Sequence, residues 1–211
     1  MEFVRAEGVN SKTIYVYDGA ALGERRNQSG PVTDPNYGIQ SNKKIWVIRE
    51  FTNSAANHLG MPLPKGRARF YRREAGGQMQ FIGENDIEHT PRDETVRVRV
   101  GDAFDVVGER KRTDIKVNFD NPLGIGRGVN GFPVKEDNSP TIDESFGITL
   151  RNHKQAPAMV RVVEHLYRWS NWEIKEKSTD FSKKDAQTIE FEVPMKASEE
   201  KSVTYKVHYS W

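Results

Sequence analysis

The chain has 211 residues, no cysteine, and a formal net charge of +2 from 32 basic and 30 acidic side chains. The absence of cysteine excludes disulfides and thiolate metal sites. The near balance of charge disfavours a nucleic-acid-binding protein, which usually carries a marked basic excess. Hydrophobic residues make up only 36% of the chain. This share suits strands that show one face to water, because only alternate residues need be apolar.

No apolar run approaches the roughly 20 residues that a membrane-spanning helix needs, so we expect no transmembrane segment. The first residues, M-E-F-V-R-A-E-G, lack the charged-then-apolar pattern of a signal peptide. Two alternatives stay open. Either the protein remains where it is made, or the chain was cut from a longer precursor, in which case we expect a periplasmic or secreted location.

Short β-rich runs alternate with turn signals through the first half of the chain. In T-V-R-V-R-V, from Thr95 to Val100, the valines are expected to point inward and Arg97 and Arg99 outward. The run Ala103–Gly108 is expected to place Phe104 in the core. The predicted strands of this half are Thr13–Tyr17, Lys44–Phe51, Arg67–Tyr71, Gln78–Ile82, Thr95–Val100, Ala103–Gly108 and a polar continuation over Glu109–Val117.

The second half shows the same spacing of strands and turns. Its predicted strands are Ser145–Asn152, Ala158–His165, Trp172–Lys175, Thr188–Val193 and Lys201–Tyr209. Little helix is expected, with at most one turn over Ser182–Ala186. The pattern predicts an all-β protein with antiparallel sheets and the character of an immunoglobulin-like β-sandwich.

The stretch Asn118–Pro140 is rich in Gly, Asn and Pro and is too long for an ordinary loop. We therefore predict an N-terminal β region over residues 1–120, a Gly/Pro-rich linker or flap over 121–140, and an immunoglobulin-like sandwich over 141–211. Whether the two β parts share a sheet is left open.

No motif in the sequence points to catalysis, a cofactor or a metal. The run Gly126–Gly131 matches G-x-G-x-x-G, but Pro122 and Pro133 stand where a dinucleotide site needs a strand and a helix, so a loop is expected. The five histidines show no zinc-binding spacing, and no G-x-S-x-G is present. The carboxylates around His89 fall in a segment expected to be exposed, where they activate nothing. We predict no catalytic residue, no cofactor and no metal ligand.

Arginines supply the first candidate binding surface. Arg67, Arg69 and Tyr71 fall on one face of their strand, and Arg97 and Arg99 point outward on another. If the two strands are adjacent, these five residues form a basic and aromatic face suited to an anionic glycan, a phosphate or an acidic protein. The alternative is that cross-strand acidic residues neutralise the arginines.

A second candidate is the tryptophan pair Trp169 and Trp172, next to Tyr167 and Arg168. Two indole rings so close together can form a platform on which a sugar stacks. The alternative is that one tryptophan plugs the sandwich core and the other lies on its rim.

Distinctive runs over Lys44–Trp211 carry a family resemblance. They are N-H-L-G-M-P-L-P-K-G from Asn57, F-I-G-E from Phe81, H-T-P from His89, V-G-D-A-F-D-V-V-G-E-R-K from Val100, L-R-N-H-K from Leu150, V-R-V-V-E-H from Val160 and T-Y-K-V-H-Y-S-W from Thr204. With these runs the chain resembles the C-terminal domain-of-unknown-function family of mucoidy-inhibitor-A-like bacterial proteins. The resemblance implies a bacterial envelope or secreted protein with a coiled coil ahead of this all-β part. It implies no reaction and no catalytic residue.

From these observations we expect a non-catalytic binding or assembly module of a bacterial envelope protein, which engages a protein or glycan by strand-edge pairing or by the basic face. Two alternatives are a hydrolase acting on an envelope polymer and an oligomeric structural protein. The sequence leaves the oligomeric state open.

Overall fold

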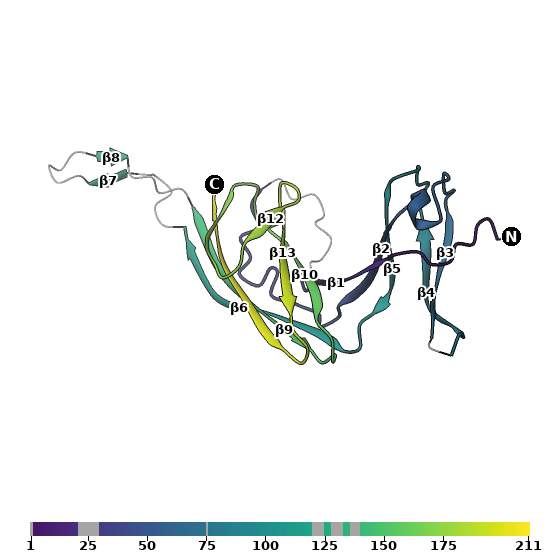
Figure 1. The fold of residues 1–211 in the computed structure, drawn as a ribbon. Coiled ribbons are helices and arrows are strands. Elements are labelled where there is room, and N and C mark those ends of the chain that lie inside the picture. The colour runs from purple at the N-terminus through teal and green to yellow at the C-terminus, as the bar shows by residue number, and fades with distance from the viewer. Residues whose placement is uncertain (1, 21–29, 75, 120–124, 128–132, 136–139) are drawn as a thin grey trace.

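The computed structural model describes residues 2–20, 30–74, 76–119, 125–127, 133–135 and 140–211. Within these residues the regular structure consists of fourteen strands and a single 3-10 turn, η1 (Ala55–Asn57) (Figure 1). The predicted all-β class with antiparallel sheets and little helix is confirmed. The finer prediction of an immunoglobulin-like arrangement stays a prediction.

Predicted and observed strands agree well in the second half of the chain, where β10 begins and ends at the predicted residues. The strands are β1 (Lys12–Asp18), β2 (Trp46–Thr52), β3 (Gly66–Arg73), β4 (Met79–Ile87), β5 (Thr95–Asp102), β6 (Val106–Asn118), β7 (Ile125–Arg127), β8 (Pro133–Lys135), β9 (Thr141–Asn152), β10 (Ala158–His165), β11 (Trp172–Lys177), β12 (Phe181–Lys183), β13 (Thr188–Met195) and β14 (Glu200–Ser210). The helical turn considered near Ser182 is wrong, since Ser182 and Lys183 belong to β12.

Two sheets form the body of the molecule, near the centre of Figure 1. The six-stranded sheet has the order β12-β13-β10-β1-β2-β5, and the four-stranded sheet has the order β11-β14-β9-β6. Neighbouring strands are antiparallel except β1 and β10, which run parallel. In both sheets each strand puts every second side chain toward the facing sheet.

The main core lies between these sheets. In β9 every second side chain is buried, among them Ile142, Phe146, Ile148 and Leu150, and the residues that alternate with the buried ones are half-buried. Facing side chains come from β1, β10 and β13, and the neighbouring strand β14 adds its own to the same core. Burial of one such side chain contributes about 1.5–3 kcal/mol, so this cluster supplies much of the apolar stabilisation.

The sandwich is built from both sides of the predicted boundary at residues 121–140. From the first part of the chain, β1 pairs with β10 in one sheet and β6 pairs with β9 in the other. The two parts therefore share both sheets, which is the arrangement the sequence left open. An independent sandwich of residues 141–211 is too small, because β1 and β6 supply a strand to each sheet.

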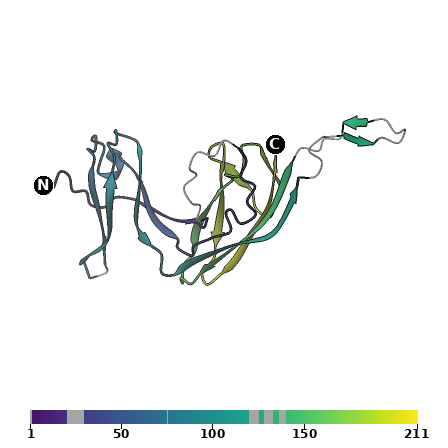
Figure 2. The same ribbon diagram turned by 180° about the vertical axis from the view of Figure 1, so that it is seen from behind.

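A smaller core lies at one end of the molecule, beyond the edge of the sandwich (Figure 2). There the hairpin β3–β4 packs against β5. Leu63, which forms an isolated bridge with Thr90, adds a side chain to the same core. Its buried residues are Leu63, Val96 and Val98, against which Phe51, Phe70 and Ile87 pack. Close packing of β4 on β5 depends on Gly83, since a Cβ there would lie 2.2 Å from the carbonyl oxygen of Val100.

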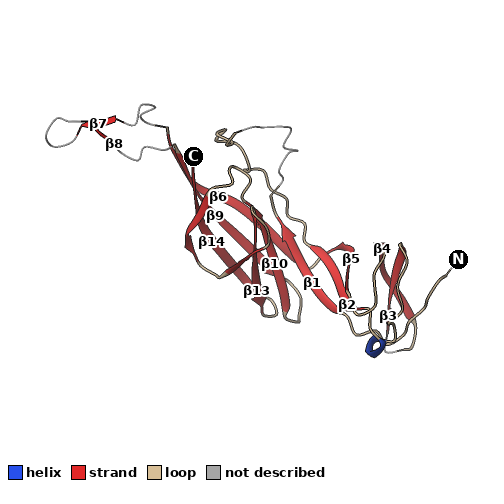
Figure 3. Ribbon diagram, turned by 90° about the horizontal axis from the view of Figure 1, so that it is seen from above, coloured by secondary structure: helices blue, strands red, loops and turns tan. Residues whose placement is uncertain are grey.

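The opposite end of the molecule is formed by β6 and β9, which pair from Val106 and Asn152 to Asn118 and Thr141. Beyond them the short strands β7 and β8 pair and point away from the sandwich (Figure 3). Part of the predicted linker or flap thus forms a two-stranded sheet. Residues 121–124, 128–132 and 136–139, with Gly128 and Gly131 of the glycine motif, lie outside the described residues.

Phe104 corrects one prediction. It was expected in the core, but its side chain is 100% exposed. The chain bends at Phe104 and Asp105 between β5 and β6, so the alternation of Ala103–Gly108 is broken. Val106 begins the strand and is buried, whereas the bend directs Phe104 into solvent.

Replacement of Gly83 tests how the hairpin is docked. We expect Gly83→Ala to lower the free energy of unfolding by at least about 2 kcal/mol, because the new methyl group meets the backbone of Val100. Gly76→Ala is the control, since no atom lies within 4 Å of its Cβ position. It should change stability by no more than about 0.5 kcal/mol. Urea unfolding measures both, and equal values would contradict the docking described.

Candidate functional site

The predicted arginine face is divided between two sheets. β3, which carries Arg67 and Arg69, pairs only with β4 in a two-stranded sheet. β5, which carries Arg97 and Arg99, is the end strand of the six-stranded sheet. β4 is the strand of that hairpin which contacts β5, as Asn85 Nδ2 donates a hydrogen bond to the carbonyl of Arg99. The two arginine pairs therefore do not lie on adjacent strands.

Each of these arginines has an acidic partner. Arg67 lies 3.1 Å from Glu84 and 3.3 Å from Asp86, and Arg69 lies 2.9 Å from Glu84. These are cross-strand neighbours on β4. Arg97 and Arg99 are likewise paired, with Glu50 at 2.6 Å and Asp102 at 2.7 Å respectively. The positive charge is neutralised at close range, so the arginines do not form a free anion site.

Tyr71, the fifth residue of the predicted face, has a different environment. It stands opposite Phe81 across the hairpin, with ring centroids 5.5 Å apart and the planes at 62°. Tyr71, Phe81 and the nearby Met79 are 49%, 52% and 51% exposed. Since soluble proteins rarely expose such groups together without a use, this end of the hairpin is a candidate binding surface. We call Tyr71, Met79 and Phe81 the hairpin aromatic patch.

The two predicted platform tryptophans lie at the rim of the main core. Both Trp169 and Trp172 are half-buried and pack against the core cluster. Trp172 Nε1 donates to the carbonyl of Ala186 at 2.8 Å, and Lys183 Nζ lies 4.7 Å from the centre of its ring. A face of Trp172 is thus already covered by a cation. Sugar stacking on this pair stays a prediction.

A buried charge cluster, which the sequence reasoning missed, lies inside the sandwich. Arg168 and Glu144 form a bidentate pair with contacts of 2.6 and 2.9 Å, and both side chains are at most 3% exposed. Arg112 also donates to Glu144, at 3.0 Å. Fork-to-fork pairing of this kind fixes the geometry of both partners.

A second ion pair lies deeper in the same interior. Arg110 Nε donates to both carboxylate oxygens of Glu164 at 2.9 Å, and the Tyr205 hydroxyl donates to Glu164 at 2.5 Å. Burial opposes the charge of Arg110, but Glu164 and Tyr205 outweigh it and raise the pKa of Arg110 above its usual value. Burial, reinforced by Glu164, raises the pKa of Tyr205 well above its usual value. Arg110 therefore stays charged and Tyr205 stays neutral.

The three arginines of this cluster also hold a surface segment by its backbone. We call residues 32–38 the strap. Arg168 donates to the carbonyls of Val32, Asp34 and Tyr37 at 2.8, 2.9 and 3.2 Å. The carbonyl of Pro35 accepts from Arg112 at 2.5 Å, and that of Gly38 accepts from Arg110 at 2.6 Å. The strap closes the mouth of the sandwich over the ion pairs.

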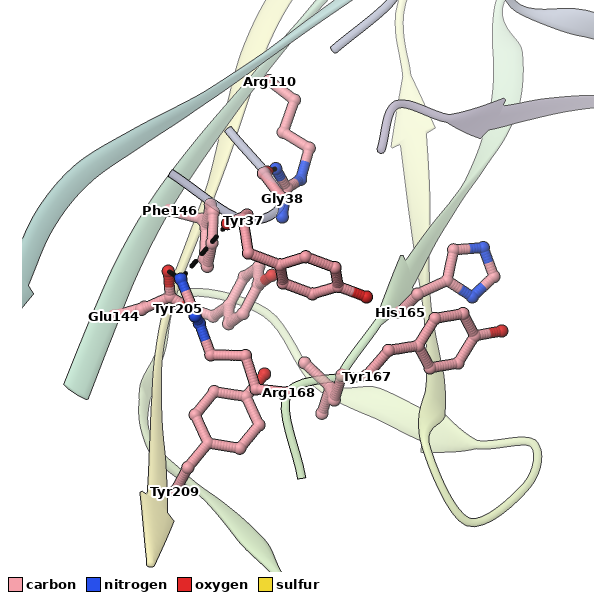
Figure 4. A pocket seen from close by; sticks show the side chains of 11 residues that line it. Tyr37, Gly38, Arg110, Glu144, Phe146, His165, Tyr167, Arg168, Tyr205 and Tyr209 are labelled. Carbon is pink, nitrogen blue, oxygen red and sulfur yellow. Dashed lines mark hydrogen bonds and ion pairs between the residues drawn. The ribbon is translucent and has the colours of Figure 1, made fainter. Parts of the chain in front are cut away.

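Under the strap lies a small cavity, lined by Tyr37, Arg110, Glu144, Phe146, Arg168 and aromatic neighbours (Figure 4). Its volume is about 10 Å³, at the lower limit for one water molecule. The carboxylate that lines it, Glu144, is held by Arg168 and Arg112. A cavity this small leaves no room for a substrate.

Sequence alternation held a signal for this cluster. Glu144 stands between Ile142 and Phe146 in a run whose alternate residues are apolar, and Glu164 stands between Val162 and Leu166 in the same way. An acid at an inward position needs a buried cation. Because the arginines come from elsewhere in the chain, the partners themselves follow only from the fold.

His165 links two strands at the edge of the cavity. Its Nε2 lies 3.0 Å from Asp18 on β1, and its ring stacks on Tyr167 with centroids 4.9 Å apart. The hydrogen bond to Asp18 raises the pKa of His165, with desolvation opposing and with Glu164 and Asp185 adding to the rise. His165 is the titrating residue that joins β10 to β1.

The described residues contain no group of three or more His, Cys, Asp or Glu arranged to hold a metal ion. No helix in the described ranges has the length and apolar character needed to cross a bilayer. Comparison with protein-family models, with curated proteins and with solved structures found no match. The family resemblance drawn from the sequence motifs therefore stays a prediction.

Replacement of Arg168 tests the weight of the buried cluster. We expect Arg168→Met to lower the free energy of unfolding by about 3–5 kcal/mol, because the buried carboxylate of Glu144 loses its bidentate partner and the strap loses three bonds. Arg69→Met is the matched control at an exposed ion pair, and it should cost no more than about 1 kcal/mol. Chemical denaturation measures both. A cost for Arg168→Met as small as that of the control would contradict the role given to the cluster.

The His165–Asp18 pair predicts a pH dependence of stability. Because the folded pKa of His165 is raised, its contribution is complete below about pH 6.5, the unfolded value, and is lost as the pH rises through the folded pKa. The difference in unfolding free energy between wild type and His165→Gln should therefore shrink as the pH rises. NMR titration should also show a lower His165 pKa in Asp18→Asn. A difference that is constant with pH would refute this.

Proposed function

We propose that this chain is a non-catalytic protein-binding module whose contact surface is the hairpin aromatic patch. The observation that carries the proposal is the half-exposed, edge-to-face pair Tyr71 and Phe81, with Met79 beside it. Tyr, Phe, Met and Arg are enriched in protein interfaces, where large side chains bury much area for little loss of conformational entropy. The patch lies on a two-stranded hairpin that projects from the body, which leaves it open to a partner.

The chemistry of the patch suits a protein segment with an apolar side chain flanked by a carboxylate. Arg73 stands opposite Met79 and shares the face of the patch, whereas Arg72 pairs with Gln80 on the other face of the hairpin. Arg73 lies 2.8 Å from the exposed Glu7. A partner carboxylate on this face would compete with Glu7 for Arg73, and an exposed ion pair of this kind is worth no more than about 1 kcal/mol.

A glycan is less well supported as the ligand. Sugars stack on open ring faces, and the 62° angle between Tyr71 and Phe81 turns the edge of one ring onto the face of the other. Anionic glycans need free cations, whereas Arg67 and Arg69 are occupied by Glu84 and Asp86. The ion pairs of Arg67 and Arg69 thus argue against a charged sugar as the ligand.

Little supports the hydrolase alternative. The buried carboxylates Glu144 and Glu164 are each held by an arginine, and the cavity beside them has a volume of only about 10 Å³. An acid–base pair needs access to a substrate and a free carboxylate.

The proposal includes a location in a bacterial envelope protein, which is carried over from the family resemblance.

Peptide display tests the proposal even though the partner is unidentified. A random-peptide library is panned on the whole wild-type chain, and the selected peptides are then measured on wild type and on Tyr71→Ser/Phe81→Ser. We expect peptides that carry an apolar residue next to Asp or Glu. Their affinity should fall by about 30-fold in the double variant, as for a central interface anchor.

Arg67→Gln/Arg69→Gln is the control on the same hairpin face and should change the affinity less than about three-fold. The double variants must keep the wild-type unfolding midpoint for the comparison to count. Peptides that bind both proteins equally would remove the patch as the site. A glycan array on which binding depends on Arg67 and Arg69 would replace the protein ligand with an anionic sugar.

A further inference from the structure

The outer edge of β6 has an open stretch near the far end of the sandwich. Toward its start this edge is covered, because Gly108 N–H donates to Lys43 and the Ser41 hydroxyl donates to the carbonyl of Arg110. A bulge between Arg112 and Asp114 then adds one residue. Beyond the bulge, none of the described residues forms a backbone hydrogen bond with the outward N–H and C=O groups of Ile115 and Val117.

The bulge decides which backbone groups face outward. Before it, the even-numbered residues Gly108 and Arg110 direct their N–H and C=O groups away from β9. One extra residue shifts the alternation, so Ile115 and Val117 present theirs outward. Residues 114–118 pair with β9 in unbroken register. This regular stretch is a template to which another strand can add.

The side chains of the open stretch carry both charge and apolar surface. Asp114 and Lys116 are exposed on the outer face of the sheet. On the inner face Val117 is 37% exposed and Phe119 49% exposed, with the Phe119 ring 6.0 Å from that of Trp211. An added strand would cover apolar groups on one side and meet alternating charges on the other.

These charges are complementary to a second copy of themselves. In an antiparallel pairing with Ile115 opposite Ile115 of the second copy, each Asp114 stands opposite the other copy's Lys116. The arrangement is repeated by the two-fold axis, so two opposite-charge pairs form at once. Shifting the centre to Lys116 or to Asp114 would instead bring like charges together. Electrostatics therefore selects one register.

The other edge strands fit self-pairing less well. β3 belongs to a two-stranded sheet whose register is broken by a bulge between Phe70 and Tyr71, a feature that disfavours strand addition. β11 is six residues long and has a bulge between Ile174 and Glu176 in its middle, a feature that blocks strand addition. β12 has only three residues.

From the open edge, the apolar strip and the charge register, we infer that the chain forms a two-fold dimer through antiparallel pairing of β6, centred on Ile115. The pairing joins the four-stranded sheets of two copies into one continuous sheet. It goes beyond the binding role of the hairpin aromatic patch, which lies at the other end of the molecule and stays free in the dimer.

Charge exchange at Asp114 and Lys116 tests the inference with the whole chain. Wild type is expected to show a concentration-dependent monomer–dimer equilibrium in sedimentation velocity. Either single variant, Asp114→Lys or Lys116→Asp, places two like charges opposite each other at both of the 114–116 pairs of the dimer. Each variant should therefore raise the dimer dissociation constant about ten-fold or more. An equimolar mixture of the two variants should restore dimers, because every pair is again of opposite sign.

Asp180→Lys is a control for charge alone, since Asp180 is exposed in the turn between β11 and β12, away from β6. It should leave dimerisation within about three-fold of wild type. A wild type that stays monomeric at its highest soluble concentration overturns the inference. So do dimers that persist in both single variants, or a mixture that stays monomeric. None of these results decides the peptide-binding test of the hairpin aromatic patch, which is a separate experiment.

Discussion

Two buried ion pairs set the form of this molecule. Glu144 and Glu164 project into the space between the sheets, where an unpaired carboxylate would be several kcal/mol unfavourable. Arg168 and Arg110 neutralise them, and each arginine has donors left over after its carboxylate is satisfied. Those donors determine where the strap lies, and the strap closes the sandwich. Register, loop position and closure of the interior thus follow from the same charges.

Local alternation was enough to predict the all-β class and most strands, because one buried face per strand leaves a period of two in the sequence. Alternation did not predict the exposure of Phe104, because a bend in the chain takes this residue out of the strand without altering the local sequence pattern. It also did not predict that the two parts of the chain share both sheets. Pairing of β1 with β10 and of β6 with β9 joins residues far apart in sequence, and no local pattern encodes such partners.

The candidate site shows the same division. Outward arginines at Arg67 and Arg97 were predicted from alternation, but their acidic partners depend on which strands lie next to them. Tyr71 belonged to the predicted face for its position, yet its importance comes from Phe81, which the hairpin brings opposite. Neutralised arginines beside exposed aromatics turn a surface that looked suited to anions into one suited to apolar contact.

The strap has one consequence for how the sequence of this protein can vary. Its five bonds to Arg168, Arg112 and Arg110 are all accepted by main-chain carbonyls, so they do not depend on which side chains the strap carries. Point changes there should be tolerated wherever the backbone path is kept. Insertions and deletions would move the carbonyls out of register with fixed guanidinium groups. Related sequences should therefore differ in the residue types of the strap but keep its length.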